Sequence, residues 1–356
     1  MRRGHFARLA PVCPVCAEHS PLVVLRESRA DEQTIHEGAL VCSNQACLRE
    51  YPIVDGLALV VRDLRAHLAE QWTQVQARED LDESTESLLG DACGGGSVLD
   101  SLRQHVSNYA FDHYGEFDPR ETQRDPAPGS IARLLHRLLD AAGELVAGPL
   151  IDVGCSVGRT SFELAERTQR EVVGVDLHHA KLRLAARVLR EGRVVYARRR
   201  VGLVYDRREF GVSFPTSARV DFWSADAVAQ PFASGSFAAV VALNLLDCAR
   251  SPLEVLAESA RLLAPGGKLV LACPYDWSSS ATAPESWIGG HSQRGAGGGA
   301  SEPLLRALLT PGAHPQSLPD LDIVQELDDL DWHVRLHERS SVRYRAHALI
   351  ARKRMH

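Results

Sequence analysis

Three aspartates lie in or directly after short apolar runs in the middle of the chain. Asp152 belongs to a run that begins at Leu150, and Asp176 and Asp226 come at the ends of two later runs. Apolar runs of this length predict buried parallel strands, whose carboxyl ends meet at one edge of a sheet. We therefore expect three carboxylates to face a common ligand at that edge.

A glycine turn after the first run is the second feature with a chemical use. Gly154 and Gly158 free the backbone at the strand tip, so that a ligand can lie against the main chain, and a helical pattern begins at Ser161. A dinucleotide-binding turn normally has a third glycine where Ser156 stands. The turn therefore indicates a nucleoside ligand other than a dinucleotide.

The acids narrow the choice of ligand, because three carboxylates repel a pyrophosphate and suit a cationic molecule that contains adenosine. S-adenosylmethionine is such a molecule. On this interpretation Asp152 orients the turn near the methionine amine, Asp176 accepts the ribose hydroxyls and Asp226 meets the adenine amine. The predicted cofactor contacts are Asp152, Gly154, Cys155, Ser156, Gly158, Asp176, Leu177, Asp226, Ala227 and Asn244.

Four of the eight cysteines form two close pairs near the N-terminus, Cys13 with Cys16 and Cys42 with Cys47. Each pair brings two thiolates to one point, and together they predict a closed, tetrahedral Zn²⁺ site with a structural role. The other four cysteines are scattered, which favours a metal site in a reducing compartment over a disulfide framework. The alternative is that the paired thiols are unrelated buried cysteines.

The segment that follows these cysteines, Tyr51-Pro-Ile-Val-Asp-Gly56, carries a family resemblance. It resembles the hallmark ending of the small zinc-binding family known as activator subunits of tRNA and protein methyltransferases. The resemblance stops near Val61 and implies that the N-terminal segment is a zinc ribbon.

A second resemblance covers most of the remaining chain, from about Asn108 to Arg354. This part resembles a class I S-adenosylmethionine-dependent methyltransferase and, more narrowly, the methyltransferase domain of ovothiol biosynthesis. That domain methylates an imidazole nitrogen of a thiol-bearing histidine, and it commonly follows an iron-dependent synthase, whereas a zinc ribbon precedes it here. The matching runs are Asp152–Ala165, Asn244–Asp247, Pro274–Trp277 and Trp287–Gly290.

The resemblance implies a small-molecule N-methyltransferase whose acceptor is an imidazole or a related heteroaromatic ring. Methyl transfer is an in-line displacement at a carbon that sulfonium already activates, so the protein mainly positions the nucleophile and excludes water. A neutral imidazole nitrogen is a competent nucleophile, and a carboxylate can hold the N–H of its partner nitrogen. The predicted catalytic residues are Asp247, Asn244, His113 and Tyr275.

Aromatic side chains complete the predicted acceptor pocket, although such rings can equally belong to the hydrophobic core. The cluster Asn108–Gly115 precedes the glycine turn. It is either a segment whose rings cap the sheet or a lid over cofactor and substrate. The predicted substrate-binding residues are Tyr109, Tyr114, Trp277 and Trp287.

These features divide the chain into a zinc ribbon at residues 1–61, a helix and linker at 62–107, and a methyltransferase domain at 108–356. Apolar spacing predicts an amphipathic helix over Arg62–Arg78, with a glycine-containing linker after it. We expect an α/β fold with a Rossmann-like sheet. Alternation at Trp332, Val334 and Leu336 predicts a C-terminal antiparallel hairpin that closes this sheet.

Composition limits the partners. The 356 residues carry a formal net charge of −6, which argues against a general polyanion binder. No apolar segment has the length of a membrane span, and the basic N-terminus has no apolar core of secretory length. We therefore expect a cytoplasmic protein with a small-molecule acceptor, and no membrane partner.

Two other functions remain open from the sequence. The arginine clusters Arg198–Arg200 and Arg207–Arg208 are either solvated or bind an anion, and with the ribbon they fit an RNA methyltransferase that acts on tRNA or rRNA. Alternatively, the ribbon recruits a partner protein or a second copy to a non-enzymatic scaffold. The presence of all three acids argues against the scaffold.

Overall fold

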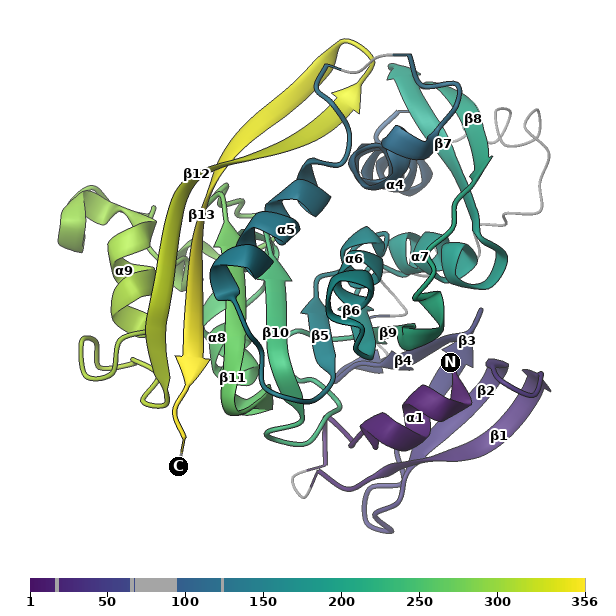
Figure 1. The fold of residues 1–356 in the computed structure, drawn as a ribbon, viewed down its shortest axis with the longest axis horizontal. Coiled ribbons are helices and arrows are strands. Elements are labelled where there is room, and N and C mark those ends of the chain that lie inside the picture. The colour runs from purple at the N-terminus through teal and green to yellow at the C-terminus, as the bar shows by residue number, and fades with distance from the viewer. Residues whose placement is uncertain (17–18, 65–66, 68–94, 123–124, 356) are drawn as a thin grey trace.

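A single mixed sheet with helices on both faces organises the protein (Figure 1). The structure is a computed structural model that describes residues 1–16, 19–64, 67, 95–122 and 125–355. Within these residues the sheet has eleven strands in the order β1-β2-β3-β4-β9-β6-β5-β10-β11-β13-β12, and β7 and β8 form a separate pair. The expected Rossmann-like α/β fold is confirmed.

The strands and helices keep the labels of Figure 1. The strands are β1 (Leu22–Ala30), β2 (Ile35–Cys42), β3 (Glu50–Val54), β4 (Leu57–Val60), β5 (Leu150–Val153), β6 (Val172–Asp176), β7 (Arg193–Val201), β8 (Val204–Gly211), β9 (Val220–Ala225), β10 (Phe237–Leu243), β11 (Leu263–Cys273), β12 (Leu321–His337) and β13 (Ser340–Lys353). The α-helices are α1 (Arg3–Leu9), α4 (Val98–Tyr114), α5 (Ser130–Ala142), α6 (Arg159–Thr168), α7 (His179–Glu191), α8 (Pro252–Leu262) and α9 (Ser301–Leu308).

The central strands β9, β6, β5, β10 and β11 are parallel neighbours. In this register Asp152 lies opposite Gly174 on one side and Val241 on the other. The carboxyl ends of these strands therefore meet at one edge. The predicted C-terminal hairpin is also confirmed, because β13 pairs antiparallel with both β11 and β12.

The N-terminal segment extends this sheet. Asp55 and Gly56 both have positive φ, at 52° and 79°, and form the two-residue turn of the β3–β4 hairpin. Strand β4 then pairs in parallel with β9. The Asp-Gly turn of the ribbon motif thus reverses the chain so that β4 can pair with β9. Strands of the predicted ribbon, residues 1–61, and of the central parallel sheet therefore belong to one sheet.

Helix α4 begins ahead of the boundary predicted at residue 108. Its N-cap is Ser97, whose hydroxyl accepts a hydrogen bond from the backbone N–H of Asp100 at 3.2 Å. The rest of the predicted linker, and most of the predicted helix Arg62–Arg78, fall outside the described residues. None of the helices in the described part is both long and apolar enough to cross a bilayer.

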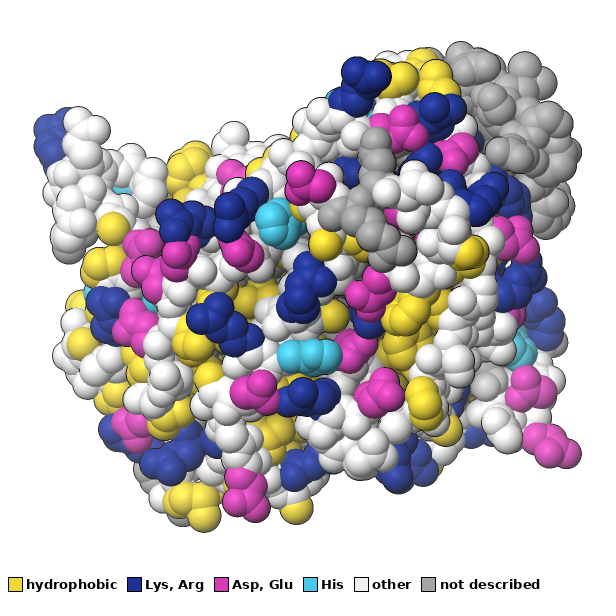
Figure 2. Space-filling model, turned by 45° about the horizontal axis from the view of Figure 1, so that its top comes forward, with side chains coloured by type: hydrophobic (Ala, Val, Ile, Leu, Met, Phe, Trp, Pro, Cys, Tyr) yellow, Lys and Arg dark blue, Asp and Glu magenta, His cyan; other side chains and the backbone are white. Residues whose placement is uncertain are grey.

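The β7–β8 hairpin is an insertion that sequence periodicity did not predict. It joins α7 to β9 and packs against α4, and it is rich in charged residues. Basic and acidic side chains are interspersed over the face shown in Figure 2.

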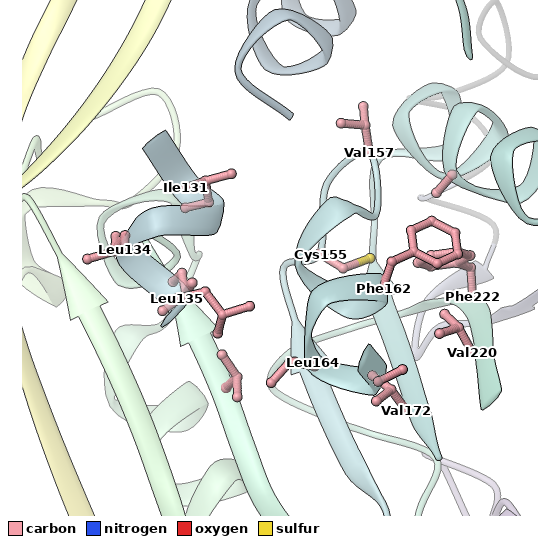
Figure 3. Packing of buried hydrophobic residues seen from close by; sticks show 14 of the residues in the cluster. Ile131, Leu134, Leu135, Cys155, Val157, Phe162, Leu164, Val172, Val220 and Phe222 are labelled. Atoms are coloured by element: carbon pink, nitrogen blue, oxygen red, sulfur yellow. The ribbon is translucent and has the colours of Figure 1, made fainter. Parts of the chain in front are cut away.

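Each face of the sheet has its own hydrophobic core, because successive strand residues point to opposite sides. Leu150 and Val172 face α4 to α7, whereas Ile151 and Val173 face α1, α8 and α9. Figure 3 shows side chains of α5, α6 and β9 in the first of these cores. The two cores hold the strand ends that form the site.

Candidate active site

A cavity of about 460 Å³ lies at the carboxyl edge of the central strands. The glycine turn and the ends of β6, β9 and β10 form its floor, and residues of α4, α5, α7 and β12 contribute the other walls. The predicted cofactor contacts that line it are Asp152, Gly154, Ser156, Asp176, Leu177, Asp226, Ala227 and Asn244.

Asp152 is buried at the base of the cavity. Its Oδ2 accepts hydrogen bonds from the hydroxyls of Thr160 at 2.6 Å and Ser161 at 2.7 Å. Burial raises the pKa of Asp152 to about 6, partly offset by these two hydrogen bonds, and the nearby Asp176 raises it further. The carboxylate is therefore a group whose charge a bound cation would stabilise.

Asp176 is held rigidly by the backbone. Its Oδ2 accepts from the N–H of Ser156 at 2.9 Å and its Oδ1 accepts from the N–H of His178 at 2.7 Å. Each oxygen keeps a lone pair for another donor. The side chain is thus fixed in an orientation in which it can accept two ribose hydroxyls.

Asp226 lies at the end of β9, where its Oδ1 accepts from the N–H of Val228 at 3.1 Å. Arg250 is 3.9 Å from its Oδ2, and both residues line the cavity. The three acids predicted to face one ligand are therefore brought together by the sheet.

Two predicted cofactor contacts do not line the cavity. Cys155 is buried in the hydrophobic core. Gly158 is needed for packing, because its φ is +91° and a Cβ there would lie 2.6 Å from that of Ala185 and 2.7 Å from the ring of Phe222. Both residues therefore support the turn through the core: Cys155 packs into it, and Gly158 leaves room for Ala185 and Phe222.

Asn244 follows β10 and faces the cavity with an unpaired amide. Both the Oδ1 and the Nδ2 atoms are buried without a hydrogen-bond partner. Its backbone has φ of +52°, a left-handed conformation that Asn tolerates better than most residues. A buried amide without a partner costs free energy, so its natural complement is a ligand.

Asp247 lies beside this amide but not in the cavity lining. It is in a short 3₁₀ turn, Leu246–Cys248, and its Oδ2 accepts from the N–H of Asp276 at 2.8 Å. The Oδ1 atom is buried without a partner, and burial raises the pKa of the carboxyl. Asp247, predicted as a catalytic residue, is therefore a buried carboxyl outside the cavity lining, whereas Asn244 lines it.

Tyr275, also predicted as a catalytic residue, does not line the cavity either. Its hydroxyl hydrogen-bonds to Nδ1 of His347 at 2.7 Å, and Nε2 of His347 is 2.9 Å from Glu326. The backbone of Tyr275 is held at φ +58°. The aromatic ring therefore anchors the loop after β11, and its hydroxyl is not free for the cavity.

Trp277 and Trp287 stack on each other with ring centroids 6.0 Å apart, outside the cavity lining. Their indole N–H groups donate to Ser301 and to the carbonyl of Thr282. These rings support the loops between β11 and α9. The two rings, predicted to line the acceptor pocket, do not line this cavity, and both indole N–H groups are engaged by neighbouring loop and helix residues.

The predicted lid lies on the last turns of α4. Tyr109 and His113 line the cavity, whereas Tyr114 is fully buried and donates from its hydroxyl to the carbonyl of Val157 at 2.7 Å. Burial lowers the pKa of His113 to about 3, and its Nδ1 accepts from the N–H of Arg159 at 3.3 Å. His113 is therefore neutral, with its proton on Nε2, and is a donor rather than a base.

Sequence reasoning missed several lining residues. Lys181 lies on α7 and Trp332 on β12, and Cys248 follows Asp247. Lys181 lies in the first turn of α7, shortly after Asp176 in the chain. Its closeness in sequence to a predicted cofactor contact could have indicated that it lines the cavity. For Trp332 the sequence predicts only a place in the C-terminal hairpin, because no local pattern indicates that this hairpin reaches the sheet edge.

Most arginines of the two clusters form ion pairs or hydrogen bonds within the protein. Arg198 and Arg208 are buried, and the β7–β8 hairpin is tied by them to the rest of the fold. The ion pairs are Arg198 with Glu121, Asp206 and Glu338, Arg200 with Glu338, Arg207 with Glu209, and Arg208 with Asp118 and Asp206. Arg199 contacts Gln104.

Three of the four paired cysteines come together in the N-terminal segment. The sulfur atoms of Cys13, Cys42 and Cys47 lie within 4.8 Å of one another. The Sγ of Cys16 accepts from the side-chain amide of Asn44 at 3.2 Å, and its backbone N–H donates to the Sγ of Cys13 at 3.4 Å. Three converging thiols with backbone N–H···S contacts fit a thiophilic metal ion.

Comparison with known proteins identifies relatives of the central part of the chain. A family model for a methyltransferase domain matches residues 151–271. Methyltransferase GfsG of Streptomyces halstedii is 27% identical over 199 residues, which cover 52% of this chain and 63% of that protein. O-methyltransferase cnsE of Penicillium expansum is 26% identical over 174 residues, or 49% of this chain and 54% of that protein.

Among solved structures, phosphoethanolamine N-methyltransferase 2 of Haemonchus contortus, in complex with S-adenosyl-L-methionine, is 22% identical with a TM-score of 0.34. That match covers 50% of this chain and 36% of the other. The chain spans only part of the length of the curated relatives it matches, 54% and 63% for the two named. The family match, together with the parallel sheet and its three acids, shows that the chain contains a class I S-adenosylmethionine-dependent methyltransferase domain.

Proposed function

We propose that this protein transfers the methyl group of S-adenosylmethionine to a small molecule held in the cavity. The observation that carries this proposal is that three carboxylates and an unpaired amide face one cavity of about 460 Å³. That volume lies within the range of small-molecule sites.

We further propose that the acceptor atom is an imidazole nitrogen, as in a histidine-derived molecule. Asn244 offers a carbonyl oxygen that can accept the ring N–H, while the other nitrogen attacks the methyl group. To Asp247, in the short 3₁₀ turn Leu246–Cys248 that follows Asn244 in the chain, we assign the dispersal of the positive charge that develops on the ring. Trp332 and Tyr109 supply flat apolar walls for such a ring.

A hydroxyl acceptor is the second candidate, because cnsE is named as an O-methyltransferase. A hydroxyl must lose a proton to become a good nucleophile, which requires a base. Of the described residues that line the cavity, His113 is the one histidine, and it presents an N–H rather than a lone pair. A neutral imidazole needs no deprotonation before it attacks, which favours the nitrogen acceptor.

RNA is a weaker candidate. The arginine clusters that motivated it are bound to carboxylates and side-chain amides of the protein itself. An RNA methyltransferase predicts tRNA affinity that falls steeply with salt, which filter binding at two salt concentrations tests.

The experiment that tests the acceptor uses S-adenosylmethionine with a labelled methyl group and the purified chain. Histidine, a thiol-bearing histidine, histamine, a simple phenol and tRNA are offered separately, and products are identified by mass spectrometry. We expect methylation of an imidazole compound at a ring nitrogen. Methylation of the phenol or of tRNA alone would contradict the nitrogen proposal, and absence of turnover with all of them would contradict the choice of acceptors.

We also propose that Cys13, Cys16, Cys42 and Cys47 hold a structural zinc ion. Tyr51 supports this site, because its hydroxyl is 3.1 Å from the Sγ of Cys13 and its strand leads into β4. Metal loss should therefore loosen the pairing of β4 with β9. Metal analysis of the purified chain is expected to give one zinc per molecule, and Cys42→Ser should lose it.

The matched control for that variant is Cys248→Ser, whose thiol lies in the cavity and outside the cysteine cluster. It should retain zinc. Equal metal content in wild type and Cys42→Ser would contradict the site.

A further inference from the structure

Lys181 lines the cavity, where its ammonium is withdrawn from water. Its ammonium lies 3.7 Å from the centroid of the Tyr109 ring. In the described part of the chain no carboxylate forms an ion pair with it. Asp176 is the carboxylate that supports its charge, but that side chain is hydrogen-bonded to the N–H groups of Ser156 and His178.

An ammonium withdrawn from water costs free energy unless an opposite charge compensates it. Burial accordingly lowers the pKa of Lys181. Contact with the Tyr109 ring offsets part of this cost. The remaining cost is most simply met by a ligand that brings negative charge into the cavity.

His113 presents a second donor to the same space. Because its Nδ1 accepts from the N–H of Arg159, the proton of the neutral ring is on Nε2. The side chain is 4% exposed, and over the residues that the structure describes this Nε2–H has no acceptor. Lys181 is close enough to help lower the pKa of His113, so the two donors share one environment.

Tyr109 supplies the third donor and lies between the other two. Its ring packs edge-on against His113 with centroids 6.5 Å apart. Burial and the neighbouring carboxyls raise its pKa, so the hydroxyl keeps its proton. No described residue accepts a hydrogen bond from it.

These observations divide the cavity by charge. Asp152, Asp176 and Asp226 line the side formed by the strand ends, and Tyr109, His113 and Lys181 line the side formed by α4 and α7. A ligand with both charges, cationic at one end and anionic at the other, satisfies both walls. Amino acids have this character.

We propose that Tyr109, His113 and Lys181 form a carboxylate-binding subsite of the cavity. The proposal rests on the proposed function, since it assigns the carboxylate to one of the two molecules that methyl transfer requires. One source is the methionine end of the cofactor. The other is an amino-acid acceptor such as histidine.

Two matched ligand pairs separate the sources by isothermal titration calorimetry on the full chain. The first pair is S-adenosylhomocysteine and its decarboxylated analogue. The second pair is L-histidine and histamine, each added to the complex with S-adenosylhomocysteine. Each pair differs by one carboxylate, so the ratio of the two affinities reports the contribution of that group.

The decisive variant is Lys181→Met, which keeps the length of the side chain and removes its charge. Lys181→Arg keeps the charge, and Lys268→Met changes the net charge equally but at a lysine that contacts the carbonyls of Ala142 and Glu144. We expect one pair to show a carboxylate preference of about 10-fold to 100-fold in wild type, which Lys181→Met abolishes. Lys181→Arg should keep most of it and Lys268→Met all of it.

Loss of the preference in the first pair assigns the carboxylate to the cofactor, and loss in the second assigns it to the acceptor. If wild type has no preference in either pair, or Lys181→Met keeps both, the subsite does not exist. If no imidazole is methylated but the first pair still depends on Lys181, the proposed acceptor is wrong and the subsite stands. Thermal unfolding of ligand-free Lys181→Met confirms folding and should show no loss of stability, since an uncompensated charge is removed.

Discussion

Replacing Asp176 by asparagine tests the cofactor site most directly, because the structure shows what each oxygen of this carboxylate does. Both oxygens accept a backbone N–H, from Ser156 at 2.9 Å and from His178 at 2.7 Å. An asparagine amide has one oxygen and one NH₂ group. In Asp176→Asn the NH₂ group must therefore face one of these two N–H donors.

The expected magnitude follows from that conflict. One charge-assisted hydrogen bond to a ribose hydroxyl is lost, which is worth roughly 1.5–3 kcal/mol, or about 10-fold to 150-fold in Kd. One backbone N–H also loses its acceptor, at a cost of about 1–3 kcal/mol to the free energy of unfolding. Loss of the negative charge next to Asp152 offsets part of the second cost, because Asp176 helps to raise the pKa of Asp152.

The assay is isothermal titration of S-adenosylhomocysteine, with thermal unfolding of the ligand-free protein alongside. The control is Asp140→Asn, which removes the same charge at a side chain that is 67% exposed and pairs with Arg167. We expect weaker binding and a lower melting temperature in Asp176→Asn only. Affinity within twofold of wild type would refute the assignment of Asp176 to the ribose.

Three further predictions follow from the same geometry. The pKa of Asp152 is raised from 3.8 to about 6, so lowering the pH from 7 to 5 should stabilise the ligand-free protein by about 1–1.5 kcal/mol, because the folded state takes up the proton first. The affinity for S-adenosylhomocysteine should fall over the same range as the carboxylate protonates. Asp152→Asn should remove both trends in titrations from pH 7 to pH 5. Asn244→Gly should reduce kcat/KM for the acceptor by about tenfold or more without a large drop in the melting temperature, because the amide that it removes has no partner in the fold and glycine accepts the positive φ of this position; a stability loss that accounts for the lost activity would speak against a substrate role. Gly158→Ala should destabilise the protein by about 2–4 kcal/mol in urea unfolding, and clearly more than Gly298→Ala, whose backbone is in the same left-handed region (φ 71°, ψ 14°, against φ 91°, ψ −3° at Gly158) but has no atom within 4 Å of the new Cβ; equal effects would show that backbone strain alone matters.

Local patterns in the sequence were sufficient for the central architecture. Short, mostly apolar runs predicted β5, β6 and β9, and parallel pairing of these strands follows from the helices between them. Because parallel strands end at one edge, the proximity of Asp152, Asp176 and Asp226 could be inferred without coordinates. The glycine turn was equally visible, since only a backbone with positive φ fits there.

The charged hairpin β7–β8 could not be recognised in the same way. Its strands bury Val194, Tyr196 and Arg198 in alternation, but arginines hide the apolar period, and Arg198 is buried only because distant acids pair with it. The docking of β4 against β9 was also invisible, because it depends on pairing between segments far apart in the chain.

The sequence by itself determined which residues end the strands, and hence the acids and the amide that can meet a cofactor. Only the tertiary structure decided which neighbours complete the cavity. It left Tyr275, Trp277 and Trp287 outside the cavity lining, and it brought Lys181 and Trp332 into that lining. The physical reason is that strand and turn propensities act over a few residues, whereas the walls of a cavity are set by how whole elements pack across the sheet edge.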